Sequence, residues 1–176
     1  MPGLFERLSD LLAYPPISRV RRNHGLEHAT LHILAERRPG RSLAGYSDLR
    51  GFWIAGDVDI ADVNAAVSEA LLRLNSGEGD LAVHPFCGTN LATAGILAGG
   101  AAALAMFGAG RRLRDKLDRV PLAMSLATLA LILAQPLGMA LQKQVTTSGV
   151  PGALRVVRII PQPRGRIKAH RVLTEG

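Results

Sequence analysis

Residues 23–35 read NHGLEHATLHILA, and their only formal charge at neutral pH is the carboxylate of Glu27. On a helix of 3.6-residue period the apolar side chains of this stretch point in nearly every direction, which is typical of a helix buried on all sides. The stretch is too short to cross a bilayer, so we expect a helix inside a protein core or a re-entrant helix. Three histidines and a carboxylate within such a helix indicate a chemical role.

The spacing of these polar residues suggests what the role is. At about 100° per residue, His24 and His28 lie one turn apart on the same side of the helix, with Glu27 beside them. The pattern His-x-x-Glu-His is that of the inverted zincins, in which two imidazoles hold zinc and the glutamate is the general base. Hydrogen-bonded core histidines without metal are the alternative. His32 is expected to bond to the backbone or to orient a ligand.

A second group of candidate ligands follows the first after a long interval. His84 and Cys87 lie three positions apart on a predicted turn, and both residue types bind zinc. A catalytic zinc ion usually has three protein ligands and one open position. We therefore predict that Glu27 is the catalytic base and that the metal ligands come from His24, His28, His84 and Cys87. A buried turn without metal, or a Cys87 nucleophile with a histidine base, remains open.

Composition narrows the class of protein. The chain has 176 residues and a formal net charge of +7, with 48% hydrophobic and only 4% aromatic residues. Its arginines are spread over the N-terminal part, a middle loop and the tail, with few aromatic residues between them. This pattern argues against nucleic-acid binding and favours contact with anionic lipid. Cys87 is the only cysteine, which excludes an intramolecular disulfide.

Two long uncharged runs predict a transmembrane hairpin over residues 91–141. The runs Leu91–Gly110 and Pro121–Leu141 each have about the length that spans a hydrocarbon core, and a basic loop separates them. Gly95 and Gly99 form a small-xxx-small pair, which predicts close packing on another helix and a route to a homo-oligomer. No cleaved signal peptide is visible, so we expect the bacterial cytoplasmic membrane with both termini in the cytoplasm.

The segments that flank the hairpin predict an interfacial α+β domain. Residues 1–90 form its N-terminal part and residues 142–176 a C-terminal tail. Pro15-Pro16 separates an amphipathic helix from the motif helix, which we place from Ser18 to Arg37. The further expected elements are a hairpin at 42–56, a helix at 60–74, an extended piece at 81–83, and a second hairpin at 153–174 with its turn at 161–165. The two hairpins are expected to share one small sheet.

The paired segments resemble a known group of proteins. HGLEH at 24–28 and HPFCGTN at 84–90, the latter just before a membrane span, are similar to bacterial integral membrane-protein families of unknown function. The resemblance covers the chain up to residue 110 and implies a membrane protein with a metal site. The similarity to inverted-zincin peptidases is limited to the helix motif. Their downstream glutamate ligand has no secure counterpart here, since Glu69, which could take that place, is expected to be a solvated side chain.

The function predicted from these residues is a zinc-dependent hydrolase, first of all a metallopeptidase, at or within the membrane surface. Its expected partners are the lipid bilayer and a membrane-protein or peptide substrate. A closed tetrahedron of four ligands would instead indicate a non-catalytic protein with a structural metal. A histidine and glutamate network without metal would indicate a proton relay. His170, in the basic tail, is expected at the surface.

Overall fold

The computed structural model describes residues 3–162, 165 and 167–176, and the chain divides into two compact units. The first unit is built from residues 1–84 and 143–176, and the second from residues 85–142. The second unit is therefore an insertion between two halves of the first. The mixture of helices with a sheet agrees with the predicted α+β composition.

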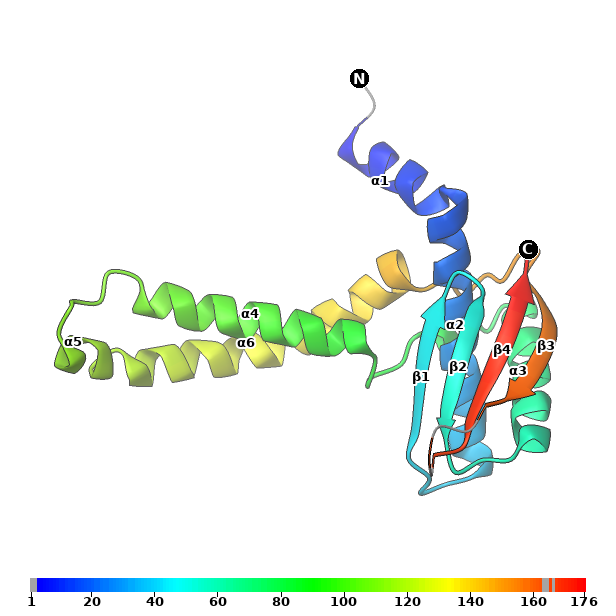
Figure 1. The fold of residues 1–176 in the computed structure, drawn as a ribbon. Helices are drawn as coiled ribbons and strands as arrows, with labels where there is room; N and C mark the ends of the chain where they lie inside the picture. Colours follow the sequence, from blue (N-terminus) through cyan, green and yellow to red (C-terminus); the bar gives the residue numbers. More distant parts are fainter. Residues whose placement is uncertain (1–2, 163–164, 166) are drawn as a thin grey trace. The chain divides into compact units, whose positions relative to one another are not determined.

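A four-stranded antiparallel sheet forms one layer of the first unit (Figure 1). Its strands, in the spatial order β1-β2-β4-β3, are β1 (Leu43–Asp48), β2 (Gly51–Gly56), β4 (Ala169–Glu175) and β3 (Arg155–Pro161). Both predicted hairpins are present and they share this sheet, as expected. In the turn of the second hairpin, residues 163, 164 and 166 lie outside the described residues.

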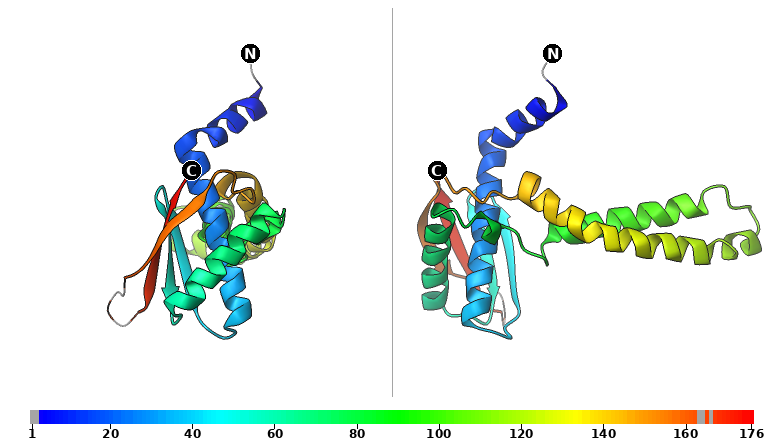
Figure 2. Two further views of the ribbon diagram at one scale, coloured as in Figure 1. Left: turned by 90° about the vertical axis from the view of Figure 1, so that its right-hand side faces the viewer. Right: turned by 180° about the vertical axis from the view of Figure 1, so that it is seen from behind.

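Helices cover one face of this sheet, as the edge-on view in Figure 2 shows. They are α2 (Pro15–Arg37) and α3 (Ile60–Asn75), and α1 (Leu4–Ala13) precedes them. Helix α2 begins at Pro15 and not at Ser18, because a proline in the first helical turn sacrifices no hydrogen bond. The piece expected to be extended at 81–83 belongs largely to a 3-10 turn, η1 (Gly79–Ala82).

The core lies between the two layers. Phe52 and Ile54 of β2 and Val172 of β4 are fully buried against the helices. Leu26 and Leu34 of α2 are fully buried in the same cluster. Each such side chain contributes about 1.5–3 kcal/mol to folding through removal from water, so this core fixes α2 against the sheet.

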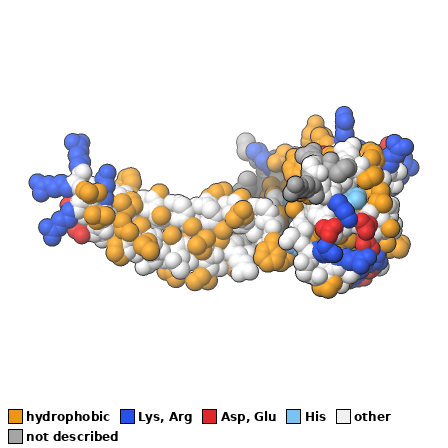
Figure 3. Space-filling model, turned by 60° about the horizontal axis from the view of Figure 1, so that its bottom comes forward, with side chains coloured by type: hydrophobic (Ala, Val, Ile, Leu, Met, Phe, Trp, Pro, Cys, Tyr) orange, Lys and Arg blue, Asp and Glu red, His pale blue; other side chains and the backbone are white. Residues whose placement is uncertain are grey.

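The second unit is a helical hairpin. It contains α4 (Gly88–Met106), the short α5 (Leu113–Leu117) and α6 (Val120–Leu141), and a π-helical turn, η2 (Gln142–Thr146), leads out of it. By length and composition two helical stretches could cross a membrane, Gly88–Met106 with a mean hydropathy of 1.4 and Leu113–Thr146 with 1.8. Figure 3 shows hydrophobic side chains along this hairpin and Lys and Arg side chains gathered at its tip.

Small residues bring α4 and α6 together, but not at the predicted positions. Among the described residues, no atom lies within 4 Å of a Cβ built on Gly95 or Gly99. The close approach is instead at Gly138 of α6, where a Cβ would lie 2.5 Å from Oδ1 of Asn90 in α4. Packing of Gly95 and Gly99 against a second copy of the chain stays a prediction.

Candidate metal centre

The motif helix is buried on nearly all sides, as its sequence predicts. Leu26 and Ala29 are 0% exposed and Glu27 is 3% exposed. Gly25 allows the chain leaving η2 to pass directly over α2, because a Cβ on Gly25 would lie 2.1 Å from the carbonyl oxygen of Ser148. This close approach places backbone carbonyl groups beside the histidines.

His24 and His28 lie together on the side of α2 that faces η1 and the segment after η2. Their ring centroids are 4.4 Å apart. Nδ1 of His24 lies 3.0 Å from the carbonyl oxygen of Thr146, and Nδ1 of His28 lies 2.8 Å from that of Ala82. A carbonyl oxygen only accepts hydrogen bonds, so each Nδ1 must carry the proton. The lone pair of each ring is therefore on Nε2.

Two further histidines complete the cluster within the first unit. The ring centroid of His84 lies 5.7 Å from that of His28 and 4.9 Å from that of His32. Nε2 of His32 donates to the carbonyl oxygen of Val83 at 2.9 Å, which confirms the expected backbone bond. The predicted convergence of His84 with the motif helix is thus confirmed. We call His24, His28, His32 and His84 the histidine cluster.

The surroundings of His84 disfavour a positive charge on its ring. Burial, followed by repulsion from His32 and His28, lowers the pKa of His84 from 6.5 to about 4. His84 is therefore neutral at physiological pH, with a ring nitrogen able to act as a Lewis base. Neutral imidazole is the form in which histidine binds metals.

Glu27 lies beside the cluster in sequence, and its carboxylate is held by strand β1. The hydroxyl of Ser47 donates a hydrogen bond to Oε2 of Glu27. A Cβ on Gly45 would lie 2.0 Å from Oε1, so a larger residue at that position would force the Glu27 side chain to move. Ser47 and Gly45 were missed by sequence reasoning, because neither belongs to a recognisable motif.

Cys87 belongs to the second unit, three residues after His84 in the chain. It is the N-cap of α4, and its Sγ accepts a hydrogen bond from the backbone N–H of Thr89 at 3.4 Å. Its role as a metal ligand remains a prediction from sequence.

The expectation for His170 is wrong, whereas that for Glu69 is confirmed. His170 was expected at the surface, but it is 4% exposed and its Nε2 donates to the carbonyl oxygen of Val58. The reason is that β4 is an interior strand of the sheet and turns His170 toward the helices. Glu69 was expected to be solvated, and it forms a surface ion pair with Arg37 at 2.5 Å.

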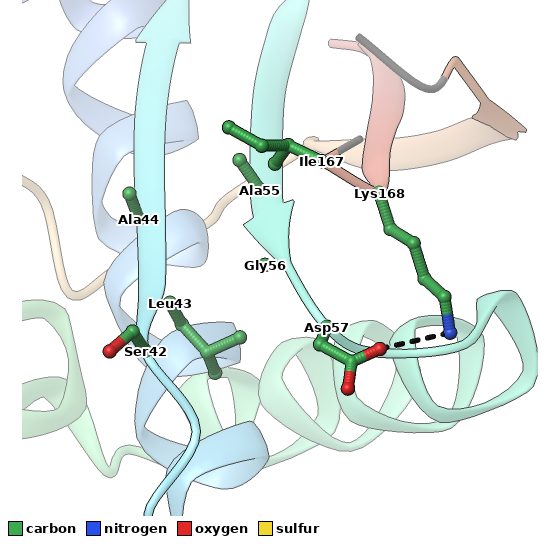
Figure 4. Close-up of a pocket in the computed structure, with 8 residues that line it drawn as sticks. All are labelled: Ser42, Leu43, Ala44, Ala55, Gly56, Asp57, Ile167 and Lys168. Carbon is green, nitrogen blue, oxygen red and sulfur yellow. Dashed lines mark ion pairs between the residues drawn. The ribbon is translucent and has the colours of Figure 1, made fainter. Parts of the chain in front are cut away.

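The cavities elsewhere in the first unit do not involve the histidine cluster. Figure 4 shows the hollow at the ends of β1 and β2, which is lined mainly by small and apolar side chains and by the ion pair of Asp57 with Lys168. None of the described residues that line it is a histidine. The histidine cluster is therefore the stronger candidate for a functional site.

Comparison with known proteins gives a family but no activity. The family described as "Domain of unknown function (DUF6391)" matches residues 19–159. An uncharacterised protein of Picosynechococcus sp. is 40% identical over 143 residues, and the match covers 73% of this chain and 66% of that relative. No solved structure matches the chain. The matched range includes both the motif helix and the residues at 84–90.

Proposed function

The chain belongs to the DUF6391 family, and we propose that it is a zinc-dependent hydrolase that cleaves peptide bonds at a bacterial membrane. The observation that carries this proposal is the hydrogen bonding of His24 and His28. In each, Nδ1 is bound to a backbone carbonyl group, and the lone pair is on Nε2. Metal-binding histidines usually have their second nitrogen held in this way, because the bond fixes both tautomer and ring orientation.

Three imidazoles, those of His24, His28 and His84, would supply the three protein ligands of a catalytic zinc. When bound, zinc lowers the pKa of a coordinated water toward about 7. Glu27, fixed by Ser47, would take a proton from the attacking water and return it to the leaving amine. Burial of Glu27 strengthens its interaction with nearby charges, because the protein interior screens them less than water does.

The position of Glu27 against β1 supports a peptide substrate. Strand β1 is an edge of the sheet, so every second residue directs its N–H and C=O groups outward. An extended peptide could pair with this edge by strand addition. Because Gly45 and Ser47 of the same strand contact Glu27, such a peptide would run past the proposed base.

The even number of candidate spans supports the placement of the site. Residues 1–84 and 143–176 form one unit, so the chain must return to the side from which it entered the bilayer. We place this unit and both termini on the cytoplasmic side of the cytoplasmic membrane, where the substrate would be a membrane protein or a peptide near the lipid surface.

A structural metal site is the second candidate. The chain reaches Cys87 three residues after His84, a separation of at most about 11 Å between Cα atoms. If Cys87 were a fourth ligand, the site would be closed and the metal would serve folding instead of catalysis. Metal content in a Cys87→Ser variant distinguishes the two, because three histidines would still retain zinc in the catalytic arrangement.

Metal content tests the site directly. We expect purified protein in detergent to hold about one zinc per chain, and His24→Ala and His28→Ala to hold at least about tenfold less. The measurement is elemental mass spectrometry after exhaustive dialysis. His170→Asn is the matched control, since it removes an imidazole outside the cluster. Equal zinc in all four proteins would contradict the proposal.

Glu27→Gln tests the mechanism separately from the metal. The amide keeps the shape of the side chain and its contact with Ser47 but cannot take up a proton. We expect zinc to stay bound while cleavage of a defined peptide library, followed by mass spectrometry, falls by about 10²–10⁴-fold. Unchanged cleavage by a zinc-loaded Glu27→Gln protein would exclude Glu27 as the base.

A further inference from the structure

A second candidate site is a basic pocket at the start of α2. The cavity has a volume of about 510 Å³ and is lined by Pro15, Pro16, Arg19, Arg22, Leu49, Arg50 and Gly176. No Asp or Glu is among its described lining residues. We call Arg19, Arg22 and Arg50 the pocket arginines.

The pocket arginines differ in their partners from the arginines of the first unit that form ion pairs. Several arginines elsewhere are paired with carboxylates: Arg37, Arg38, Arg41, Arg73, Arg155 and Arg171. Within the described part of the chain, no pocket arginine has an Asp or Glu oxygen within ion-pair distance. Asp48 attracts Arg50 without an ion-pair contact, so the pocket keeps an excess of positive charge. A concave site with an excess of charge of one sign attracts ions of the other.

Backbone groups hold two of these side chains in place. Arg22 donates to the carbonyl oxygens of Ser18, Pro151 and Gly176. Arg19 donates through Nη2 to the carbonyl oxygen of Thr174 at 2.6 Å, and its buried Nε has no hydrogen-bond partner. The peptide carbonyl groups of Ser18, Pro151 and Thr174 orient these guanidinium groups without cancelling their charge, so the site is partly organised before an anion arrives.

The nearest carboxylate is already occupied. Asp48 accepts hydrogen bonds from the side chain of Arg171 and from the backbone N–H of Arg50, both at 2.7 Å. The side chain of Arg50 makes no hydrogen bond to any residue that the structure describes. Arg50 thus remains available to an incoming anion.

The adjoining helix indicates which anion this is. Helix α1 leads directly into Pro15 and exposes Leu8, Leu11 and Tyr14, which are 41%, 55% and 58% exposed. An amphipathic helix of this kind lies in a lipid interface. Pro15 and Pro16 offer no N–H, so guanidinium groups must hold the ligand. We propose that this pocket binds the phosphate of an anionic phospholipid headgroup, with α1 along the acyl boundary.

The inference shares only membrane association with the proposed function, and its test needs no catalytic readout. The experiment is native mass spectrometry of the full chain in detergent, titrated with phosphatidylglycerol, phosphatidylcholine or inorganic phosphate. We expect a preference for phosphatidylglycerol over phosphatidylcholine. Arg50→Gln should weaken phosphatidylglycerol binding about threefold and Arg50→Glu about tenfold, as for loss and reversal of one exposed charge contact.

Arg158→Gln is the matched control, because Arg158 is an exposed arginine of β3 outside the pocket and outside the ion pairs. Arg50 bears no side-chain hydrogen bond, so its variants should fold, and Trp53 fluorescence verifies this. Three outcomes would overturn the proposal. They are equal binding of the two lipids, equal weakening by Arg158→Gln, and displacement of the lipid by equimolar inorganic phosphate.

Discussion

The two units of the chain direct their large apolar side chains in opposite ways. In the first unit, Leu26, Leu34 and Phe52 are 0% exposed and pack between the sheet and the helices. In the second unit, Leu91 and Leu104 of α4 are 77% and 76% exposed. Removal of apolar surface from water stabilises the first arrangement. The second leaves a large apolar surface on two helices that are long and apolar enough to cross a membrane.

Both units nevertheless place hydrogen-bonded polar groups in their interiors. In the first, one ring nitrogen of each of His24, His28 and His32 bonds to a backbone carbonyl group, whereas Nε of Arg19 and Nδ1 of His170 have no hydrogen-bond partner among the described residues. In the second, Asn90 donates to the carbonyl oxygen of Pro85 at 2.7 Å and accepts from Nε2 of Gln142 at 2.7 Å. The two units thus differ in the burial of their apolar side chains, while both hydrogen-bond polar groups in their interiors.

The largest expected difference in stability is between two leucine-to-alanine substitutions, one in each unit. Leu34→Ala is expected to cost about 3 kcal/mol, because it leaves a cavity in a packed core. Leu104→Ala should cost less than about 0.5 kcal/mol. Denaturant unfolding in detergent, followed by the fluorescence of Trp53, the single tryptophan, provides the measurement. Equal losses would show that the hairpin supports the first unit through its exposed leucines.

A smaller difference in stability is expected between two glycine-to-alanine substitutions, one in each unit. Gly25→Ala should destabilise the first unit by about 2 kcal/mol, because the new Cβ would meet the Ser148 carbonyl oxygen and force the backbone apart. Gly95→Ala meets no described atom within 4 Å and should stabilise α4 by up to about 1 kcal/mol through helix propensity. Thermal melting followed by circular dichroism measures both. A destabilising Gly95→Ala would instead indicate that a second chain packs there.

The smallest expected effect is on the pH dependence of the stability of the first unit. Burial raises the pKa of Asp48. Hydrogen bonds from Arg171 and from the backbone of Arg50, together with the positive charges of these two arginines, outweigh burial and bring the pKa below its ordinary value of 3.8. The stabilisation of the folded state by ionised Asp48 is therefore present above pH 3.8 and is lost as the pH falls through the lower pKa that Asp48 has in the folded state. Asp48→Asn should cost about 1 kcal/mol at pH 7. Unfolding curves of both proteins should converge in strong acid, and a constant difference would contradict this.

Much of this fold follows from local sequence patterns. The buried motif helix, the two hairpins and the helix over 60–74 each have a periodicity that a short window of sequence contains. The pairing of His84 with His28 follows from chemistry, since two groups of metal-binding residues in a short chain serve best at one site. These predictions did not require knowledge of which strand lies beside which.

The errors arose where nonlocal packing decides. His170 was assigned to the surface because it lies in a basic tail, although its alternation with Val172 and Thr174 places all three on one face of β4. Only the strand order shows that this face is covered by helices. The contact of Glu27 with Gly45 and Ser47 likewise depends on the position of β1 against α2, which local patterns do not specify.

The strand order also affects how the protein is made. Strand β2 pairs with β1 on one side and with β4 on the other, yet the whole hairpin is synthesised between β2 and β4. While the ribosome produces residues 85–142, strand β2, which contains Phe52 and Ile54, still lacks β4 as its neighbour in the sheet. The sheet, and the core that Phe52 and Ile54 form with Val172, can therefore be completed only after the hairpin has been synthesised.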